Sequence, residues 1–339
     1  MRYMRAKKEN SIDSDDMGLK FIFDLPDPII ITHGDVDGLC AAALLVREFR
    51  LNKIDVPIFI TQPFSLKQVL KEIKNKQMVG HLIVVDLALS KKSVEYLPKG
   101  SVVIDHHPSS SECIEAMDKK GVYHTINTNL SASQICGTLV TSTKFNIYLA
   151  KMGGVGDRRI IDKRMGKQAM TASSAMSLDP KDDEFRASII ADFVAGKKIT
   201  EMKEVTHRSK QAFKLLDEVK ETGDTLYNGD NIIVVFYERG FGRASVLASK
   251  LAADKSKVAL VITLMKGNNT QYLITARSPE ENGKPILDVR KFVSELMTSG
   301  EGGGLEKAAS CTIKKTTLGE FIEQIEKNDK EIQEQKMVD

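Results

Sequence analysis

One short polar segment between two apolar runs constrains this chain more than any other feature of its sequence. The β-branched run at residues 28–31 is typical of a buried strand, and the alanine- and leucine-rich run at residues 39–46 is typical of a helix packed closely on a sheet. The segment between them therefore predicts a strand-to-helix turn. It has His33, Asp35 and Asp37 at alternate positions, where their side chains would converge on one point. Two carboxylates there repel each other unless a cation lies between them, so the turn predicts a cation site.

The composition predicts two domains and no general attraction to polyanions. The chain has 339 residues, 42% of them hydrophobic, which is enough for two cores of ordinary domain size. Its 49 basic and 46 acidic residues give a formal charge of +3, so any anion site must come from local clustering of charge. The N-terminal residues are charged, and no later segment reaches membrane-spanning length. We therefore expect a soluble, cytoplasmic protein that does not bind membranes.

The four cysteines are too far apart for a zinc site or a disulfide framework. They form no Cys-x-x-Cys pair, and no histidine stands at a ligand-like spacing from them. We expect buried thiols in a reducing compartment at Cys40, Cys113, Cys136 and Cys311.

Strands and helices alternate over the first half of the chain. After the first strand and helix, apolar runs predict strands at residues 56–60, 81–86 and 101–107, with a helix at 65–76. This alternation predicts an α/β domain with a parallel sheet and helices on both faces. Ligands of such sheets bind beyond the carboxyl ends of the strands. Further along we expect a long helix at 131–150, a glycine-rich turn at 152–157, a loop at 170–182 and a largely helical stretch at 185–220.

A second, smaller α/β domain is predicted in the remaining chain. Its expected elements are a strand at 231–237, a hairpin of 258–265 with 271–276, helices at 287–297 and from 318, and a flexible loop at 302–304 before a strand at 308–313. The predicted boundaries are a flexible tail at 1–18, a first domain at 19–195, a helical linker at 196–228, a second domain at 229–325 and a C-terminal tail at 326–339.

Acids and histidines follow several of the predicted strands. Besides the first turn, they are Asp86 and the run Asp105-His106-His107, and a further acid, Asp157, ends the glycine-rich turn. A single aspartate after a strand is most often a helix cap, but four such sites in succession, two of them with histidines, are harder to explain by capping. Oxygen-rich ligands with some imidazole are typical of manganese or magnesium sites. Two such ions can activate a water and neutralise a phosphate under attack, so the set predicts phosphate chemistry.

The order of these residues resembles the DHH phosphoesterase family, named after its Asp-His-His motif, and specifically its RecJ-like, archaeal-type nuclease branch. The four matching motifs are His33-Gly34-Asp35-Val36-Asp37-Gly38, Asp86, Asp105-His106-His107-Pro108 and Gly156-Asp157. The second domain is similar to the DHH-associated domain in its segments Thr275-Ala276-Arg277-Ser278 and Gly302-Gly303-Gly304. The glycine segment continues with Leu305, where the family usually has a histidine.

The resemblance implies a role for each of these residues. Asp86 would bridge two ions, Asp105 would orient a histidine, and His107 would meet the substrate phosphate as donor or acid. The ions would be Mn²⁺ or Mg²⁺, with the ligands His33, Asp35, Asp37, Asp86, His106 and Asp157. In a cleft between a catalytic DHH domain and a substrate-binding second domain, the substrate would be held by Arg277, Ser278, Gly302, Gly303 and Gly304.

A basic cluster begins directly after Asp157. It opens with Arg158 and Arg159 and continues to residue 167. One interpretation is an ordinary solvated helix face. The other is a track for a nucleic-acid backbone, which makes Arg158 and Arg159 substrate-binding residues.

The function that the resemblance implies is a metal-dependent phosphodiesterase, a RecJ-like exonuclease of DNA repair or replication that releases mononucleotides from single-stranded DNA or RNA. Two alternatives stay open. Relatives that cleave short oligoribonucleotides or dephosphorylate nucleoside bisphosphates generally have first-motif acids three apart, so the His-x-Asp-x-Asp spacing here favours the nuclease. Replication-complex scaffolds that bind the GINS complex without catalysis usually lack motif acids, and here every one is present.

Overall fold

The computed structural model of the protein describes residues 20–76, 78, 80–220, 222–238, 243–265, 268–281, 284–296 and 302–338. These residues form two compact units. Unit 1 contains residues 20–176 and 180–209, and unit 2 contains residues 177–179 and those from 210 onward. Each unit has its own sheet and hydrophobic core. The tail predicted at residues 1–18 lies outside the described residues.

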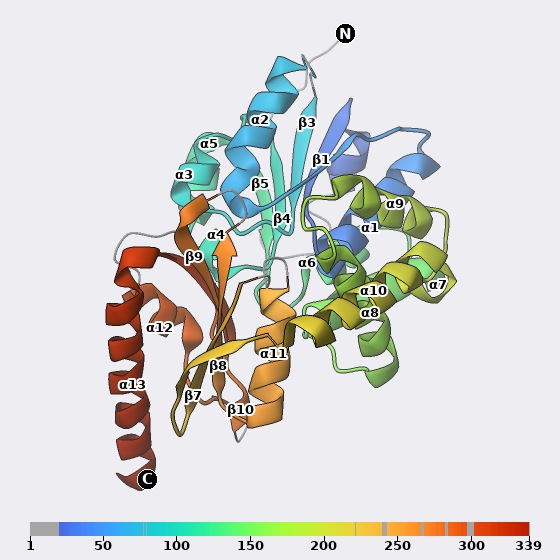
Figure 1. The fold of residues 1–339 in the computed structure, drawn as a ribbon. Helices are drawn as coiled ribbons and strands as arrows, with labels where there is room; N and C mark the ends of the chain where they lie inside the picture. Colours follow the sequence, from blue (N-terminus) through green and yellow to red (C-terminus); the bar gives the residue numbers. More distant parts are fainter. Residues whose placement is uncertain are drawn as a thin grey trace. The chain divides into compact units, whose positions relative to one another are not determined.

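Unit 1 contains the predicted parallel sheet (Figure 1). Its strand order is β2-β1-β3-β4-β5, and every neighbouring pair is parallel. The order changes direction at β1, and open sheets of this kind bind ligands outside the carboxyl ends of the strands at that point. The sequence predicts all but β5, which is short and only partly buried. The strands are β1 (Pro28–His33), β2 (Ile58–Thr61), β3 (His81–Val85), β4 (Val102–Asp105) and β5 (Tyr123–Ile126).

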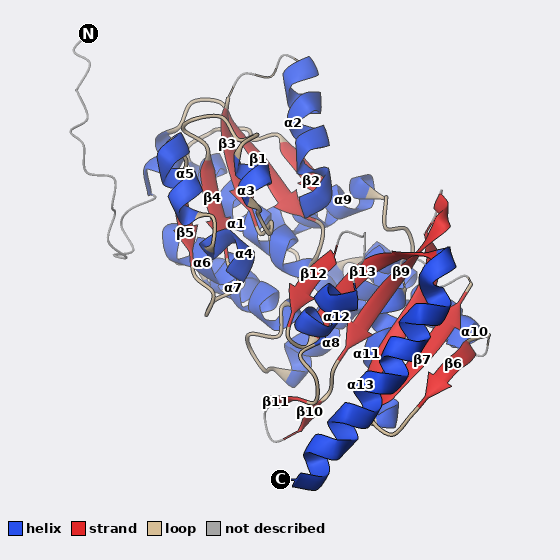
Figure 2. Ribbon diagram, turned by 90° about the vertical axis from the view of Figure 1, so that its left-hand side faces the viewer, coloured by secondary structure: helices blue, strands red, loops and turns tan. Residues whose placement is uncertain are grey.

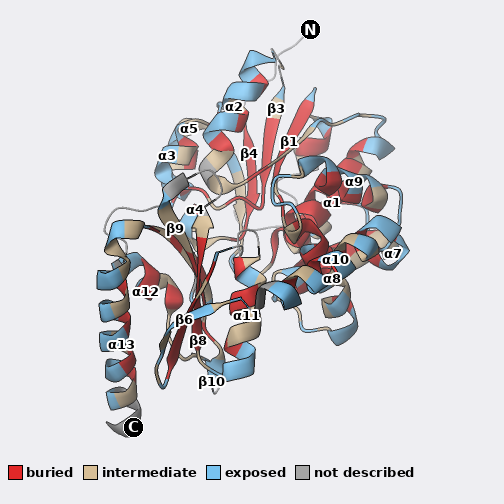
Figure 3. Cartoon of the chain, viewed as in Figure 1, coloured by how far each residue is buried: buried red, intermediate tan, exposed pale blue. Residues whose placement is uncertain are grey.

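Helices cover both faces of this sheet, as predicted, because alternate strand residues point to opposite faces. On one face Ile30 and Ile83 pack with helices α1, α6, α7, α8 and α9, and on the other Ile31 and Val84 pack with α2, α3 and α5. Figure 3 shows that strands β1, β3 and β4 are buried over most of their length. The helices are α1 (Val36–Leu51), α2 (Leu66–Asn75), α3 (Lys91–Val94), α4 (Pro108–Ser111), α5 (Ile114–Lys120), α6 (Ala132–Leu139), α7 (Lys144–Gly156), α8 (Lys163–Ser177) and α9 (Asp183–Val194). Single 3-10 turns lie at Lys20–Asp24, Pro63–Ser65 and Ile199–Glu201.

The prediction of one helix over residues 131–150 is wrong, because the chain forms α6 and α7 there. Thr143 begins α7 by accepting a hydrogen bond from the Asn146 amide at 3.0 Å. Asn146 Nδ2 donates in turn to the Thr141 carbonyl at 2.8 Å. Hydroxyl and amide side chains satisfy helix ends locally, so the polar run at 141–143 separates two helices.

The glycine-rich turn predicted at 152–157 is helical, and the loop predicted at 170–182 is helical as far as Ser177. The glycines of α7 instead allow neighbouring helices to pack closely against it. A Cβ atom at Gly153 would lie 2.1 Å from Ser133 Oγ, and one at Gly156 would lie 2.9 Å from Val36 Cβ. α7 can therefore lie directly against α1 and α6. In α8, Ala172 and Ala175 are two of the small residues that suggested a loop; both are buried, and alanine favours a helix.

Unit 2 contains a six-stranded mixed sheet of order β12-β13-β9-β8-β7-β6 (Figure 2). β8 and β9 form the predicted antiparallel hairpin, and β7 pairs with β8 in parallel. α12 and α13 pack on one face of the sheet and α11 on the other. The elements are α10 (Lys203–Lys220), β6 (Asp224–Asn228), β7 (Ile232–Tyr237), α11 (Ala244–Lys255), β8 (Val258–Met265), β9 (Asn268–Arg277), β10 (Glu280–Glu281), β11 (Lys284–Pro285), α12 (Val289–Leu296), β12 (Gly302–Leu305), β13 (Ala308–Lys314), a 3-10 turn (Lys315–Thr317) and α13 (Leu318–Val338).

The prediction of a flexible loop at residues 302–304 is wrong, because this segment forms strand β12. Gly302 pairs with Cys311 and Gly304 pairs with Ala309 across an antiparallel ladder with β13. A run of glycines has no side-chain signal for a strand, so only the neighbouring strand β13 defines it.

A buried carboxylate adds hydrogen bonds to the apolar packing of the C-terminal helix α13 on the sheet of unit 2. Asp329, 4% exposed, accepts hydrogen bonds from the Tyr227 hydroxyl and the Asn231 amide, both at 2.8 Å. Asp329→Ala would leave both donors without this partner, at a cost of about 3 kcal/mol. We expect urea denaturation to show that loss, with little change for Lys330→Ala at the neighbouring exposed position. Equal stability of the two variants would contradict this role for Asp329.

The four cysteines are buried and form no disulfide, as predicted. Among the described residues, no helix combines the length and the apolar character that crossing a membrane requires.

Candidate metal centre

Three strands of unit 1 end at the same level and bring the predicted motif residues together. Thr32 pairs with Val85, and Val85 pairs with Ile104, so the three carboxyl ends lie side by side. His33 is the last residue of β1, Asp86 directly follows β3, and Asp105 is the last residue of β4. The possible ligand atoms form two groups, and within each group all of them lie within 4.8 Å of one another. One group is His33, Asp35 and Asp86, and the other is Asp86, Asp105, His106 and His107.

Asp86 is common to both groups and lies at the centre of the site. Its Oδ1 lies 3.2 Å from His106 Nε2, and its Oδ2 lies 3.9 Å from His33 Nδ1. Oδ2 is buried and has no hydrogen-bond partner among the described residues. The backbone of Asp86 is also strained, with φ at +58°, a conformation that clusters at functional sites. A buried carboxylate oxygen without a partner is costly, and a bound cation would remove that cost.

The first turn supplies a second carboxylate. Asp35 Oδ1 caps α1 by accepting the Gly38 amide at 2.9 Å, and Oδ2 lies 3.1 Å from His33 Nδ1. Burial disfavours the charged imidazole, but the Asp35 carboxylate outweighs it and raises the pKa of His33 to about 9. The other ring nitrogen, Nε2, lies 2.9 Å from Gln62 Oε1. When Nε2–H donates to Gln62, Nδ1 of the neutral ring is free to bind a metal.

The carboxylates of this site lie close together, and burial and mutual repulsion raise the pKa of two of them. Burial, together with the nearby charges of Asp35 and Asp37, raises the pKa of Asp86 well above its usual range. Burial and the Asp35 charge raise the pKa of Asp37 to about 7. Burial and the charge of His107 lower the pKa of His106, which favours the neutral imidazole that a metal requires. An oxygen-rich set with imidazole fits a hard divalent cation such as Mn²⁺ or Mg²⁺.

Asp37 lies apart from both groups. Its Oδ2 accepts the Ala132 amide at 2.7 Å and its Oδ1 accepts the Ser133 amide at 3.1 Å, at the N-terminus of α6. The structure therefore shows Asp37 tying α1 to α6, where a helix N-terminus favours negative charge. Its role as a metal ligand stays a prediction.

Asp157 is the C-cap of α7 and lies close to His106. Its Oδ2 lies 3.5 Å from His106 Nδ1 and accepts a hydrogen bond from Arg159 Nε at 3.0 Å. Arg159 Nη2 lies 3.3 Å from the same His106 nitrogen. Arg158, between the two, is exposed and has φ at +59°. Arg159 thus directly contacts the motif residues, and a role of Arg158 toward a substrate stays a prediction.

His107 is held by a buried carboxylate. Its Nδ1 donates to Asp105 Oδ1 at 2.8 Å, and the Ser110 hydroxyl donates to Asp105 Oδ2 at 2.5 Å. Asp105 is fully buried, so both its oxygens serve to hold neighbours. Burial opposes protonation of His107, but the bond to Asp105 outweighs it and raises the pKa of His107. The histidine that Asp105 orients is therefore His107, whose Nε2 remains for a ligand.

Sequence reasoning missed Arg186, which holds the first turn from α9. This side chain is only 6% exposed, and its Nε donates to the Gly34 carbonyl at 3.1 Å while Nη1 donates to the Asp182 carbonyl at 3.1 Å. Gly34 lies between His33 and Asp35, so Arg186 fixes the backbone that carries both. The chain offers no local signal for this contact, because 152 residues separate the two partners.

We expect Arg186→Ala to weaken Mn²⁺ binding about 10- to 100-fold, because residues that orient metal ligands typically have effects of that size. Isothermal titration calorimetry measures the affinity, with exposed Arg50→Ala as the control. Arg186→Lys keeps the charge but not the planar fork, so it should restore only part of the affinity. If folded Arg186→Ala bound Mn²⁺ as tightly as the control, Arg186 would not position the turn.

The predicted substrate-binding residues of unit 2 share one end of its sheet. Arg277 and Leu305 both pair with Ala308. Arg277 donates to the Ser245 hydroxyl at 2.5 Å, and Ser278 Oγ accepts the Leu287 amide at 3.1 Å. Ser278 therefore has a structural partner, and the substrate roles of Arg277, Ser278 and the Gly302, Gly303 and Gly304 amides stay predictions.

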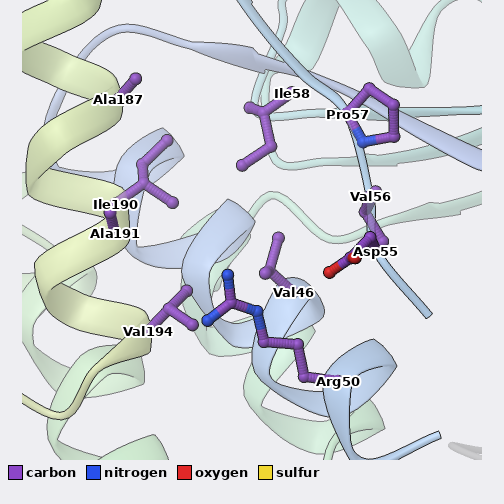
Figure 4. Close-up of a pocket in the computed structure, with 10 residues that line it drawn as sticks. All are labelled: Val46, Arg50, Asp55, Val56, Pro57, Ile58, Ala187, Ile190, Ala191 and Val194. Atoms are coloured by element: carbon purple, nitrogen blue, oxygen red, sulfur yellow. The ribbon is translucent and has the colours of Figure 1, made fainter. Parts of the chain in front are cut away.

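A pocket of about 320 Å³ lies elsewhere in unit 1, between α1, α9 and the segment before β2 (Figure 4). Apart from Arg50 and Asp55, its lining side chains are aliphatic or Pro57. None of the motif residues lines it, so it is not part of the candidate metal centre.

Comparisons with known proteins agree with the fold of both units. RecJ from Thermus thermophilus in complex with Mn²⁺ aligns with a TM-score of 0.60 at 14% identity, over 90% of this chain and 52% of that one. The DHH domain of a member of a ribosomal protein family aligns with a TM-score of 0.61 at 15% identity, over 91% and 87%. CDC45 from Entamoeba histolytica aligns with a TM-score of 0.57 at 9% identity, over 89% and 95%. This chain thus spans about half the length of that RecJ.

No curated protein matches this chain. A family model does: residues 28–165 match the DHH family, N-terminal domain. The matched stretch contains the strand ends and the turns that carry His33, Asp86, Asp105 and Asp157. Residues 28–165 thus match the N-terminal domain of the DHH family, and the fold of the chain is similar to that of RecJ.

Proposed function

We propose that this protein is a metal-dependent phosphodiesterase, a RecJ-like exonuclease that releases mononucleotides from single-stranded DNA or RNA. The DHH-family domain and the RecJ-like fold support the coarser assignment to a metal-dependent phosphoesterase family. The single observation that carries the proposal is the buried Asp86 Oδ2, which has no partner among the described residues and belongs to a carboxylate between two histidines. A bound cation would satisfy this atom, and a divalent cation held there would activate water for attack on a phosphate.

The proposed cofactors are two Mn²⁺ or Mg²⁺ ions, and the RecJ structures from Thermus thermophilus contain these metals. When bound, they supply Lewis acidity for attack of water on phosphorus. Asp86 is proposed to contact both ions. The remaining proposed ligands are His33, Asp35, Asp37, His106 and Asp157.

The other residues act on the substrate. His107, oriented by Asp105, donates a hydrogen bond to the phosphate or protonates the leaving oxygen. Arg159 neutralises charge beside Asp157. Arg277 and the Gly302–Gly304 backbone grip a second phosphate, and this part of the proposal rests on the family resemblance.

A second candidate function is supported by the CDC45 alignment, which covers 95% of that relative. On this alternative the chain is a replication-complex scaffold that binds GINS with weak or no hydrolysis. The presence of all motif acids favours the enzyme. A small-substrate enzyme, acting on short oligoribonucleotides or nucleoside bisphosphates, is the third candidate.

One assay separates the three functions. The protein is incubated with Mn²⁺ and with end-labelled DNA and RNA strands of 2 to roughly 30 nucleotides, and with a nucleoside bisphosphate. The nuclease is expected to release mononucleotides from the long strands, and the end that loses its label gives the direction. Cleavage confined to dinucleotides or the bisphosphate would support the small-substrate enzyme. No cleavage, together with capture of a purified GINS subunit, would support the scaffold.

A further inference from the structure

We infer that an exposed surface next to the metal centre binds single-stranded nucleic acid, with its cations on phosphates and Ile161 against a nucleobase. The inference rests on the proposed function and extends it to the part of the strand away from the reacting phosphate. We call this area the Arg158–Met170 surface, and it consists of Arg158, Ile161, Lys163, Arg164, Lys167 and Met170.

Ile161 is 97% exposed, more than any other large apolar side chain among the described residues. It is held in this position from both sides. Ile160 packs against the core, and its amide donates to the Gly154 carbonyl at 3.0 Å. Asp162 accepts the Met165 amide at 3.0 Å and forms an ion pair with Lys151 at 2.7 Å. Ile161 is thus presented to solvent by an anchored backbone.

The surroundings of Ile161 are cationic. Residues 158–170 contain five basic residues and one acid, Asp162, whose oxygens are engaged in the contacts just described. Lys163, Lys167 and Met170 follow one another at helical spacing on the exposed side of α8, opposite its buried face. In the described part of the chain, no carboxylate forms an ion pair with Lys163, Arg164 or Lys167.

The pattern fits a polyanion with apolar faces better than a protein partner. Cores of protein interfaces are depleted of charged residues, whereas here cations separate the two exposed apolar side chains, Ile161 and Met170, which is 60% exposed. Single-strand binding sites combine cations along the backbone with apolar platforms for bases. The surface also begins directly after Asp157, a proposed metal ligand, so its first residue, Arg158, lies beside the proposed metal centre.

The test measures binding separately from cleavage. Fluorescence anisotropy gives the Kd of a labelled 20-nucleotide DNA and RNA strand at several salt concentrations in Ca²⁺, and parallel assays in Mn²⁺ follow dinucleotide hydrolysis. Ile161→Ser is compared with Ile147→Ser, a change at another exposed isoleucine of unit 1. The double variant Lys163→Ala/Lys167→Ala is compared with Lys71→Ala/Lys74→Ala on α2.

Ile161→Ser is expected to raise the Kd about fivefold without changing its salt dependence, since it removes an uncharged contact. The Lys163/Lys167 variant should reduce the slope of log Kd against log salt by about 1.4, which corresponds to two lost single-strand phosphate contacts. Dinucleotide hydrolysis should stay as in the wild type. Strand binding equal to that of the controls would overturn the inference and leave the proposed function intact. Weakened binding in a protein that hydrolyses nothing would support the surface and reject the nuclease.

Discussion

Asp86→Asn is expected to reduce Mn²⁺-dependent hydrolysis by at least about 1000-fold while making the metal-free protein more stable. Asp86 is common to both groups of ligand atoms, so its loss removes the proposed bridge between the ions. The same carboxylate is buried beside other acids, and its Oδ2 has no partner among the described residues. Asparagine keeps the shape and removes the repelled charge. Steady-state kinetics and thermal melting in a chelator measure the two effects.

The stability gain of Asp86→Asn should depend on pH in a defined direction. The pKa of Asp86 is raised in the folded protein by burial and by neighbouring acids, so folding binds its proton more tightly. The wild type therefore loses stability as the pH rises above the unfolded pKa, and the variant does not. The gain in melting temperature should be larger at pH 8 than at pH 5. Exposed Asp55→Asn is the control, and a melting temperature of metal-free Asp86→Asn below that of this control would refute the argument.

His107→Gln is expected to lower kcat about 1000-fold and to leave Mn²⁺ affinity unchanged. His107 lies beside the proposed ligands, but its Nδ1 is bound to Asp105 at 2.8 Å, which directs Nε2 to the substrate. A matched control is His124→Gln, because His124 Nε2 pairs with Asp118 at 3.0 Å outside the site. Loss of Mn²⁺ binding in His107→Gln would instead make His107 a metal ligand.

The pH profile of kcat gives a further check on His107. His107 must be protonated to act as a donor or acid. The hydrogen bond to Asp105 outweighs the effect of burial and raises the pKa of His107 above the usual histidine value. Activity should therefore persist above that usual value and fall as the pH passes the raised pKa. Asp105→Asn removes the acceptor charge, so the alkaline limb should move to lower pH. If the alkaline limb of the kcat profile stayed at the same pH in Asp105→Asn, that limb would report the titration of a group other than His107.

Local sequence signals were sufficient for four of the five strands of unit 1, β5 being the exception, and for the convergence of the motif residues at the ends of those strands. Apolar β-branched runs such as residues 29–31 indicate strands by themselves, because burial on both faces needs no knowledge of the partners. Asp86 and Asp105 directly follow or end such runs, and parallel pairing necessarily brings the ends of neighbouring strands together. The convergence of these acids with His33 therefore follows from order and alternation alone.

The glycine-rich segments show where local signals were insufficient. The residue type of Gly153 and Gly156 does not distinguish a turn from a helix. Only the close approach of Ser133 and Val36 explains why glycine is needed at these positions of α7. Gly302 to Gly304 likewise form a strand because β13 lies beside them. A residue without a side chain has almost no conformational preference of its own, so its neighbours decide.

By itself, the sequence determined which residues stand at the strand ends, because strand and helix periodicity are local properties of the chain. Only the tertiary structure decided what those side chains contact. Asp37 binds the amides of Ala132 and Ser133, the first of them 95 residues away, and Arg186 reaches Gly34 across 152 residues. Such contacts depend on how helices pack against one another, and packing is set by the whole core rather than by any one segment.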